Sequence, residues 1–439
     1  MTRRAMIHIY TAKWRNPRRK YAAMRHARES PVCRTSELVT CAWRRYSDTM
    51  IHLLKGSIGA GILAMPDAVC RLGILWSIVG LVLVCVFATY CIQLLPMEHR
   101  LTTNLCRYAY DENIDGPPCM RWSASALYYF VDVTLITWQL GVCVIYFIFV
   151  AENVKQVCDY YGFEQSIRLH LCYVLVPLTI VNLVKDLKLL TPVSSVSNVV
   201  TCFGFILVFF YLVEDDVTLE EEKVQLKRYE DIPVFIGITL FALEAVGVVL
   251  AIEYNMEHPR QFVGLFGLFN IGMACICVLY LLVGVFGYLK YGDQVTASIT
   301  LNLPFDQKSV LVAPQVAKLT FALAIFLSFP LQNFVAYNIV WRKLKKKIPA
   351  ERQYLMDYSL RLLAVASPHL GPFISLFGAL CLSLLAMIFP ALMDVCIWYP
   401  HRYGMCYYKM LRDILIIIIG TGCLVSVPLQ VLKSFSLQL

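Results

Sequence analysis

The chain has 439 residues and a formal net charge of +9; 59% of its residues are hydrophobic and only 16% are charged. Its mean hydropathy is +0.63. A soluble domain of this length needs more charge to keep its surface wetted. These values therefore exclude an ordinary soluble protein and favour a protein embedded in lipid.

The first predicted segment is a basic tail, residues 1–49, with twelve Lys and Arg residues against three acidic ones. A mitochondrial presequence is also rich in Arg and poor in acids. No clear apolar face runs through this tail, however. We therefore interpret it as a cytosolic tail whose charges keep the N-terminus inside.

A membrane domain is predicted for residues 50–433, followed by a short C-terminal tail, residues 434–439. The hydrophobic residues of this domain come in long blocks, and most are near or above the ~20 residues that a helix needs to cross a bilayer. The sequence thus predicts an all-α polytopic membrane protein with about eleven helices. The expected spans are 50–69, 74–96, 125–151, 169–184, 191–213, 232–252, 263–289, 311–341, 356–367, 371–394 and 412–432.

The Lys and Arg residues between these spans gather on one side when the N-terminus is placed inside, as the positive-inside rule requires. The strongest cluster is "WRKLKKKIPAER", residues 341–352, and the acidic segment 214–231 falls on the outer side. The ninth span is the exception. Its longest uncharged run has nine residues, Leu362–Leu370, less than half a crossing. We therefore expect a truncated ninth helix.

Several function classes lack their sequence signatures. The seventeen cysteines contain no C-x-x-C pair and the eight histidines form no H-E-x-x-H motif, so no metal site is predicted. The spans contain no G-x-S-x-G motif and no repeated polar ring of the kind that lines a channel. We expect neither an enzyme nor a channel, with no cofactor and no nucleic-acid partner.

The first span begins unusually for a lipid-facing helix, because "IHLLKGSIGAGILAMP" carries three glycines in its first half: Gly56, Gly59 and Gly61. Each glycine costs a helix interior about 1 kcal/mol, and unwound backbone is tolerated at membrane depth only where it lines a cavity. Ser57 and the amides around Gly59–Gly61 could then hold a substrate carboxylate. Alternatively, Gly56 with Ala60 and Ser57 with Gly61 form a small-residue packing face for a neighbouring helix.

The sixth span carries a matching irregularity, Glu244 with Gly247 nearby. A carboxylate within a span costs ~2.5–3.5 kcal/mol and usually marks a functional site. Paired interruptions in corresponding halves of a chain indicate the midplane site of a secondary transporter. The alternative is a structural ion pair or a protonated, hydrogen-bonded Glu244.

His52 lies one helical turn before Gly56, on the same face. Its unperturbed pKa of ~6.5 suits a group that takes up a proton at an acidic surface and releases it in the cytosol. The alternative is a histidine in the headgroup region, since His52 is close to the inner end of its span.

Motifs spread over many spans resemble the proton-coupled amino acid transporters, a branch of the amino acid/auxin permease superfamily, in an insect-like form. They read "HLLKGSIGAGILAMP" (52–66), "WQLGVCVIYFIFVAENVKQV" (138–157), "FALEAVGVVLAIEYNM" (241–256), "HPRQF" (258–262), "GYLKYGD" (287–293), "SITLNLP" (298–304) and "LGPFISLFGALCLSLLAMIFPALMD" (370–394).

This resemblance implies a LeuT-type fold, a five-plus-five inverted repeat with an eleventh helix, and symport of a proton with a small amino acid such as glycine, alanine or proline. It places the proton-responsive role on His52. The candidate substrate-binding residues are Gly56, Ser57, Gly59, Gly61, Phe241 and Glu244. Residues of the third and eighth spans, Gln139, Ser328 and Gln332, are further pocket candidates, although interhelical hydrogen bonds are the commoner role for such side chains.

The chain departs from the family at two motifs. Ala245 stands where many relatives have a glycine after the sixth-span glutamate, so the second break is shifted or tighter. The segment "LNLPFDQKSV" lacks the cysteine of an external disulfide found in mammalian relatives, so that bridge is not expected.

The expected partners are small amino acids and membrane lipids, in the plasma membrane or a lysosomal or endosomal membrane. The short ninth span keeps two alternatives open. One is a sensor that binds the amino acid without net transport, and the other is a non-functional truncated isoform.

Overall fold

The computed structural model describes residue 50 and residues 53–54, 59–111, 118–182, 187–213, 227, 229–243, 261–262, 264, 266–303, 313–344, 370–398 and 407–438. All of them belong to one compact unit, residues 45–439. The predicted tail 1–49, the ninth span 356–367 and several connecting segments lie outside the described residues. The limits proposed for the membrane domain therefore stay predictions.

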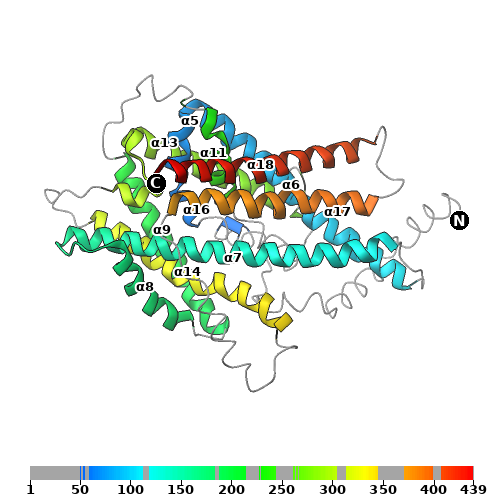
Figure 1. Ribbon diagram of the computed structural model, residues 1–439, viewed down its shortest axis with the longest axis horizontal. Coiled ribbons are helices and arrows are strands. Elements are labelled where there is room, and N and C mark those ends of the chain that lie inside the picture. Colours follow the sequence, from blue (N-terminus) through cyan, green and yellow to red (C-terminus); the bar gives the residue numbers. More distant parts are fainter. Residues whose placement is uncertain are drawn as a thin grey trace, which may run out of the picture. The chain divides into compact units, whose positions relative to one another are not determined.

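Every regular element within the described ranges is helical, which confirms the all-α prediction (Figure 1). The elements are α4 (Ala60–Leu63), α5 (Met65–Leu72), α6 (Ile74–Asp111), α7 (Pro118–Tyr160), α8 (Ile167–Asn182), α9 (Leu187–Val213), η2 (Tyr229–Asp231), α11 (Ile232–Ala242), α13 (Leu268–Tyr291), η4 (Gly292–Gln294), η5 (Ile299–Asn302), α14 (Ala313–Leu344), α16 (Leu370–Phe377), η6 (Gly378–Ile388), α17 (Phe389–Trp398) and α18 (Tyr408–Gln438).

Six helical stretches of the described chain are long and apolar enough to cross a membrane: Ile74–Leu94, Val133–Tyr160, Val196–Val213, Leu268–Gln294, Ile374–Val395 and Tyr408–Gln430. Each overlaps one predicted span. Two shorter apolar helices, Ile167–Asn182 and Pro314–Pro330, lie within or overlap the predicted fourth and eighth spans. Among the described residues of the first and sixth spans, the named helices α4, α5 and α11 are short, as expected for interrupted spans.

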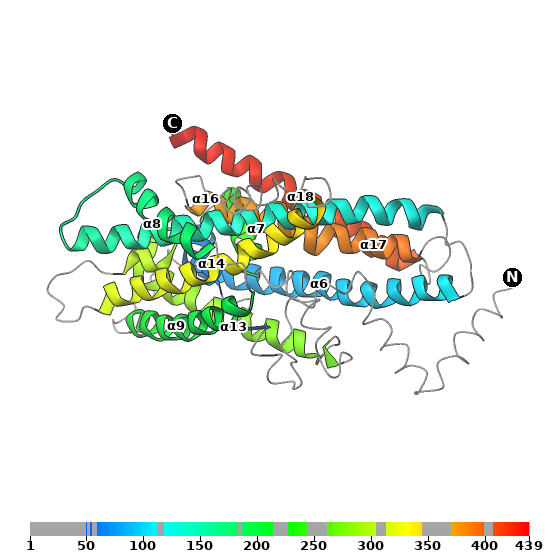
Figure 2. The same ribbon diagram turned by 90° about the horizontal axis from the view of Figure 1, so that it is seen from below.

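Helices far apart in the sequence pack along one another (Figures 1 and 2). The long α14 lies along α7 and α9, and α18 lies along η6 and α17. The short α11 is enclosed by α5, α16, η6 and α18, while α13 packs on α5 and α6. This packing buries α11 on many sides and brings the interrupted first and sixth spans together.

The turn from the first to the second span depends on a glycine. Gly73 ends α5 with φ 85° and ψ 162°, a conformation that side-chain-bearing residues rarely adopt. Its amide donates to the Val69 carbonyl 2.9 Å away, which closes the last turn of α5. The sharp end of α5 directs the chain straight into α6, which begins at Ile74.

Candidate functional site

The first span is interrupted at Gly59. Met50, Leu53 and Leu54 are helical, whereas Gly59 has the extended backbone angles φ −124° and ψ −152°. The helix resumes with α4 at Ala60 and continues through Ala64 into α5. The expected break in this span is confirmed at Gly59. Three candidate residues, His52, Gly56 and Ser57, lie outside the described residues.

The sixth-span helix α11 ends at Ala242, well before the end of the predicted span. Leu243 leaves the helix with ψ 40°, and its amide donates back to the carbonyls of Thr239 and Leu240 at 3.1 Å each. The Tyr280 hydroxyl of α13 donates to the Ala242 carbonyl at 2.5 Å, so one of the carbonyls exposed by the helix end has a partner. The position of Glu244, beyond this end, is not described.

The two interrupted spans meet at Gly61 and Ala242. A Cβ added to Gly61 would lie 2.5 Å from the Ala242 Cα and 3.1 Å from its amide nitrogen. Gly61 therefore serves close packing against a neighbouring helix, the alternative noted for this glycine, while Gly59 marks the break itself. The start of α4 and the end of α11 lie side by side. The partially positive N-terminal end of α4 is therefore next to the partially negative C-terminal end of α11.

An aromatic pair lies beside this junction. Phe241 of α11 is fully buried, and its ring centroid is 5.5 Å from that of Trp138 on α7, with the planes at 54°. The next residue on α7, Gln139, is 7% exposed, and its side-chain oxygen has no hydrogen-bond partner among the described residues. Of the predicted pocket residues, the structure thus places Phe241 and Gln139 on neighbouring helices linked by the Trp138 contact.

The tenth span contributes an irregular helix at the same place. A Cβ on Gly378 would meet the Gly237 carbonyl oxygen and would lie 2.8 Å from the Phe241 Cβ, so η6 and α11 approach backbone to backbone. From Gly378 to Ile388 the helix is a π-helix, a rare form that often occurs at functional sites. The sequence offered no signal for it, because its apolar pattern is equally compatible with an α-helix.

Ser328 forms a hydrogen bond between helices, which was the alternative to a place in the substrate pocket. Its hydroxyl lies 2.8 Å from the Ser197 hydroxyl of α9, and Ser197 also donates to the Ala324 carbonyl at 2.7 Å. These bonds join α9 to α14 within the bundle. Gln332, one turn further along α14, is half-buried and has interaction partners of its own.

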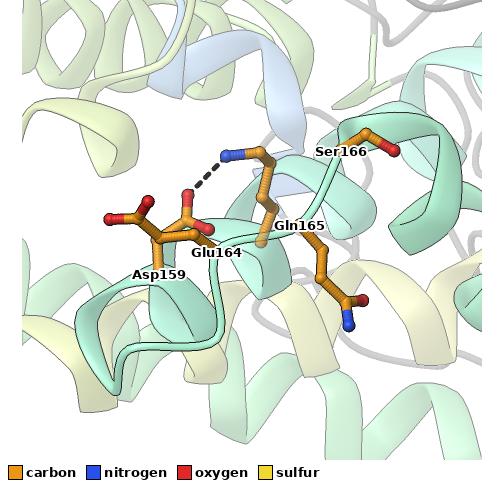
Figure 3. A pocket seen from close by; sticks show the side chains of 5 residues that line it. Asp159, Glu164, Gln165 and Ser166 are labelled. Carbon is orange, nitrogen blue, oxygen red and sulfur yellow. Dashed lines mark hydrogen bonds and ion pairs between the residues drawn. The ribbon is translucent and has the colours of Figure 1, made fainter.

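A separate surface cavity of about 480 Å³ lies at the turn between α7 and α8 (Figure 3). Its lining residues are all polar or charged: Lys155, Asp159, Glu164, Gln165 and Ser166. Lys155 and Asp159 form an ion pair across one helical turn. Gln139 precedes Lys155 by sixteen residues on one helix, about 24 Å at 1.5 Å per residue, so this cavity is distinct from the helix junction.

Trp138, Ala242 and Tyr280 are residues of the junction that were not predicted from the sequence. Trp138 is the first residue of the third-span motif "WQLGVCVIYFIFVAENVKQV", so a signal was present for it. Ala242 and Tyr280 carry no comparable signal, since both are ordinary residues of apolar spans. Their roles arise from the packing of α11 against α4 and α13.

Long apolar helices, together with two interrupted spans that meet inside the bundle, define the class of membrane transporters with broken helices. Residues 45–433 match the family model described as "Transmembrane amino acid transporter protein". The chain therefore belongs to this family of amino acid transporters, and its relatives are transporters rather than enzymes.

Two relatives and one solved structure illustrate the similarity. The chain is 35% identical over 396 residues to the Drosophila melanogaster "Proton-coupled amino acid transporter-like protein pathetic", covering 86% of this chain and 83% of the relative. It is 26% identical to the Arabidopsis thaliana "Amino acid transporter AVT3A", covering 85% and 86%. A closed structure of Mhp1, a nucleobase-cation-symport-1 family transporter with bromovinylhydantoin bound, is similar with a TM-score of 0.46 and 12% identity, over 88% of this chain and 91% of that chain.

Proposed function

We propose that this protein carries small neutral amino acids, such as glycine, alanine and proline, across a membrane together with a proton. The observation that carries the proposal is the meeting of the two interrupted spans at Gly61 and Ala242. In secondary transporters with inverted repeats, such a junction forms the substrate site. A five-plus-five repeat with an eleventh helix is the corresponding proposal for the fold.

The substrate carboxylate is assigned to the break in the first span. The backbone amides near Gly59 and the Ser57 hydroxyl would donate hydrogen bonds to this carboxylate. The partially positive end of the helix that starts at Ala60 favours an anion there. Gly56, Gly61 and Glu244 complete the proposed site. In this proposal Phe241 forms an apolar wall. The Gln139 side-chain oxygen, which has no hydrogen-bond partner within the described ranges, is a candidate acceptor for the substrate ammonium group.

The proton is assigned to His52, with no further cofactor. Support comes from the sequence position of His52 one turn before Gly56 and from the name of the Drosophila relative. A membrane potential of 100 mV supplies ~2.3 kcal/mol per charge, and each pH unit supplies ~1.36 kcal/mol. At ~1.4 kcal/mol per tenfold, one proton sustains a substrate gradient of up to a few hundredfold.

The first test is uptake of labelled alanine by cells expressing the full chain, at external pH values of about 5.5 and about 7.5, on either side of the ordinary histidine pKa of ~6.5. We expect uptake to be faster at the acidic pH. His52→Ala should remove this stimulation, whereas His26→Ala in the basic tail should leave it unchanged.

Three other outcomes would contradict parts of the proposal. Uptake that does not depend on pH in the parent chain would refute proton coupling while leaving transport intact. Acid stimulation that persists in His52→Ala would refute the assignment of the proton to His52. Alanine binding to purified protein, without uptake into proteoliposomes, would favour a sensor over a symporter.

A further inference from the structure

Three neighbouring residues of α7, Glu152, Asn153 and Gln156, each bury an oxygen atom that has no hydrogen-bond partner in the described part of the chain. The atoms are Oε2 of Glu152, Oδ1 of Asn153 and Oε1 of Gln156. Asn153 is 0% exposed. Buried polar atoms are nearly always paired, so three exceptions in one short stretch of helix indicate a site for a bound group. We call the three residues the oxygen triad.

The orientation of the two amides is fixed by carbonyl groups. The Asn153 Nδ2 donates to the Phe149 carbonyl at 2.8 Å, and the Gln156 Nε2 donates to the Leu301 carbonyl of η5 at 3.0 Å. A carbonyl accepts hydrogen bonds only, so the amino group of each amide must face it. The atom left over is therefore the oxygen in both residues, and the site lacks a donor or a cation.

The three residues share one face of α7. Glu152 and Gln156 are four residues apart and Asn153 and Gln156 are three apart, spacings that place Cβ atoms about 5–6 Å from each other on a helix. Side chains of this length, so spaced, can all reach one small group placed between them.

The triad lies where α7 changes from fully enclosed to partly exposed. Residues 145–151 are all buried, whereas Glu152 and Gln156 are half-buried, as are most residues from there to Tyr160. A small group that enters from the Tyr160 end of α7 therefore meets the triad before the closely packed part of the helix.

Glu152 carries the formal charge of the triad and lies within the apolar span Val133–Tyr160. Within the described ranges it has no ion-pair partner. The next charged residues along α7, Lys155 and Asp159, pair with each other. On α14, Lys318 donates to a carbonyl of η5 at 3.1 Å and has further interactions. An ionised carboxyl is costly inside a span and usually marks a functional site, so a bound positive charge is favourable here.

A single ligand that suits the triad brings one positive charge and pairs with all three oxygens. Water brings no charge, and a proton on Glu152 leaves the oxygens of Asn153 and Gln156 unpaired. A primary ammonium group has three N–H donors, one for each oxygen, and hard cations bind carboxylate and amide oxygens. We propose that the oxygen triad binds one monovalent cationic group, which is the ammonium group of an amino acid or a free sodium or potassium ion.

This site is separate from the helix junction. Glu152 follows Gln139 by thirteen residues, about 20 Å along α7 at 1.5 Å per residue. An ammonium group at the triad would mark a second place for the amino acid, and in that form the inference rests on the proposed transport of amino acids. Gln156 also links the triad to η5, so a bound cation helps to hold η5 on α7.

The test compares the thermal unfolding midpoint of the purified full chain in the chlorides of sodium, potassium, methylammonium and choline at equal ionic strength. Methylammonium has three N–H donors and no carboxylate, so it tests the triad independently of the carboxylate site proposed at Gly59. Choline has the same charge but no N–H donor and a bulky head. At least one of the first three salts should raise the midpoint by a few degrees over choline, because a ligand of the folded chain stabilises it.

Three variants locate the effect. Glu152→Gln removes the charge and keeps an oxygen, and it should abolish the stabilisation by the cation. Asn153→Leu removes one acceptor and should weaken binding by roughly tenfold, as expected for the loss of one hydrogen bond to a charged group. Glu164→Gln changes an exposed acid in the turn between α7 and α8 and should keep the parental effect. If Glu152→Gln does not fold, Asn153→Leu and the salt series on the parent chain still decide the outcome.

The salt series also identifies the source of the positive charge. An effect of methylammonium, shared by alanine but not by propionate, assigns the site to the substrate ammonium group. An effect of sodium or potassium alone assigns it to an alkali ion.

Two results would overturn the proposal. One is an equal midpoint of the parent chain in all four salts, which would leave as the partner either water or Lys308, a residue of the connection between η5 and α14 that lies outside the described residues. The other is a cation effect that persists undiminished in Glu152→Gln and Asn153→Leu. Because the readout needs no uptake, these results are distinct from a failure of acid-stimulated alanine uptake, which tests the proposed function.

Discussion

The close contact between Gly61 and Ala242 makes a quantitative prediction for Gly61→Ala. The new methyl carbon would lie 2.5 Å from the Ala242 Cα, whereas carbon atoms pack at about 3.5–4.0 Å. The end of α11 must therefore move away from α4 by roughly 1 Å. Because the contact is with backbone, no side-chain rotation can relieve it, and overpacking of this kind costs about 1–3 kcal/mol.

Gly422→Ala is the matched control for this variant. Gly422 is also in a helix, α18, and a Cβ there would meet nothing within 4 Å. Both variants share the gain of up to about 1 kcal/mol that alanine brings to a helix, so the difference between them isolates the steric cost. Thermal unfolding of the purified proteins and alanine uptake, normalised to protein at the membrane, are the two assays.

We expect Gly61→Ala to unfold at a lower temperature than Gly422→Ala and to take up less alanine, because it separates the two helix ends of the proposed site. Gly422→Ala should match the parent chain in uptake. Parental stability and parental uptake in Gly61→Ala would refute the argument that these helices meet in close contact.

Three further predictions concern polar contacts. Tyr280→Phe removes the hydrogen bond to the end of α11 and should destabilise the protein by about 1–3 kcal/mol through an unsatisfied buried carbonyl, measured by thermal unfolding. Ser197→Ala removes the hydrogen bond to Ser328 and should lower the free energy of unfolding by about 0.6 kcal/mol. The order of substrate preference, measured by competition in the uptake assay, should not change. Burial alone would lower the Lys227 pKa, but its bonds to Asp293 and the Tyr288 hydroxyl raise the pKa above its ordinary value. The stabilisation that these bonds give the folded protein is complete below about pH 10.4 and is lost only at higher pH. Lys227→Met should therefore lower the free energy of unfolding by no more than about 1 kcal/mol, equally at acidic and neutral pH.

Each of these predictions has a distinct contrary result. Tyr229→Phe, at a residue 73% exposed, controls for loss of a hydroxyl, and equal stability of Tyr229→Phe and Tyr280→Phe would contradict the role of the buried bond. A changed order of substrate preference in Ser197→Ala would indicate that Ser328 contributes to the substrate pocket. A cost for Lys227→Met that grows between acidic and neutral pH would contradict the raised pKa.

Much of the fold could be predicted from the sequence because a bilayer imposes a length and a polarity on every segment that crosses it. The long α6, α9, α13 and α18 each begin or end close to the boundaries set by their hydropathy. The break at Gly59 was predictable for a local reason, since glycines within one turn remove helical stability wherever they occur. The surroundings of Glu244 and the ninth span lie outside the described residues, so those predictions still stand untested.

The contacts of the candidate site were harder to predict from the sequence, because they join residues far apart along the chain. Ser328 was a pocket candidate by residue type, but its partner Ser197 lies 131 residues away on α9. Gln156 belongs to the third-span motif, but its partner Leu301 lies 145 residues away in η5, and only the packing of η5 on α7 brings the two together.

The sequence by itself thus determined the class of protein, the approximate limits of most of the spans that the structure describes, and the position of one helix break, since each follows from the composition of a single segment. Only the tertiary structure decided that Gly61 meets Ala242, that Phe241 packs on Trp138, and that Gln156 binds η5. Local composition sets how a segment lies in the bilayer. Which side chains meet is decided by close packing between helices, where a single methyl group changes the fit.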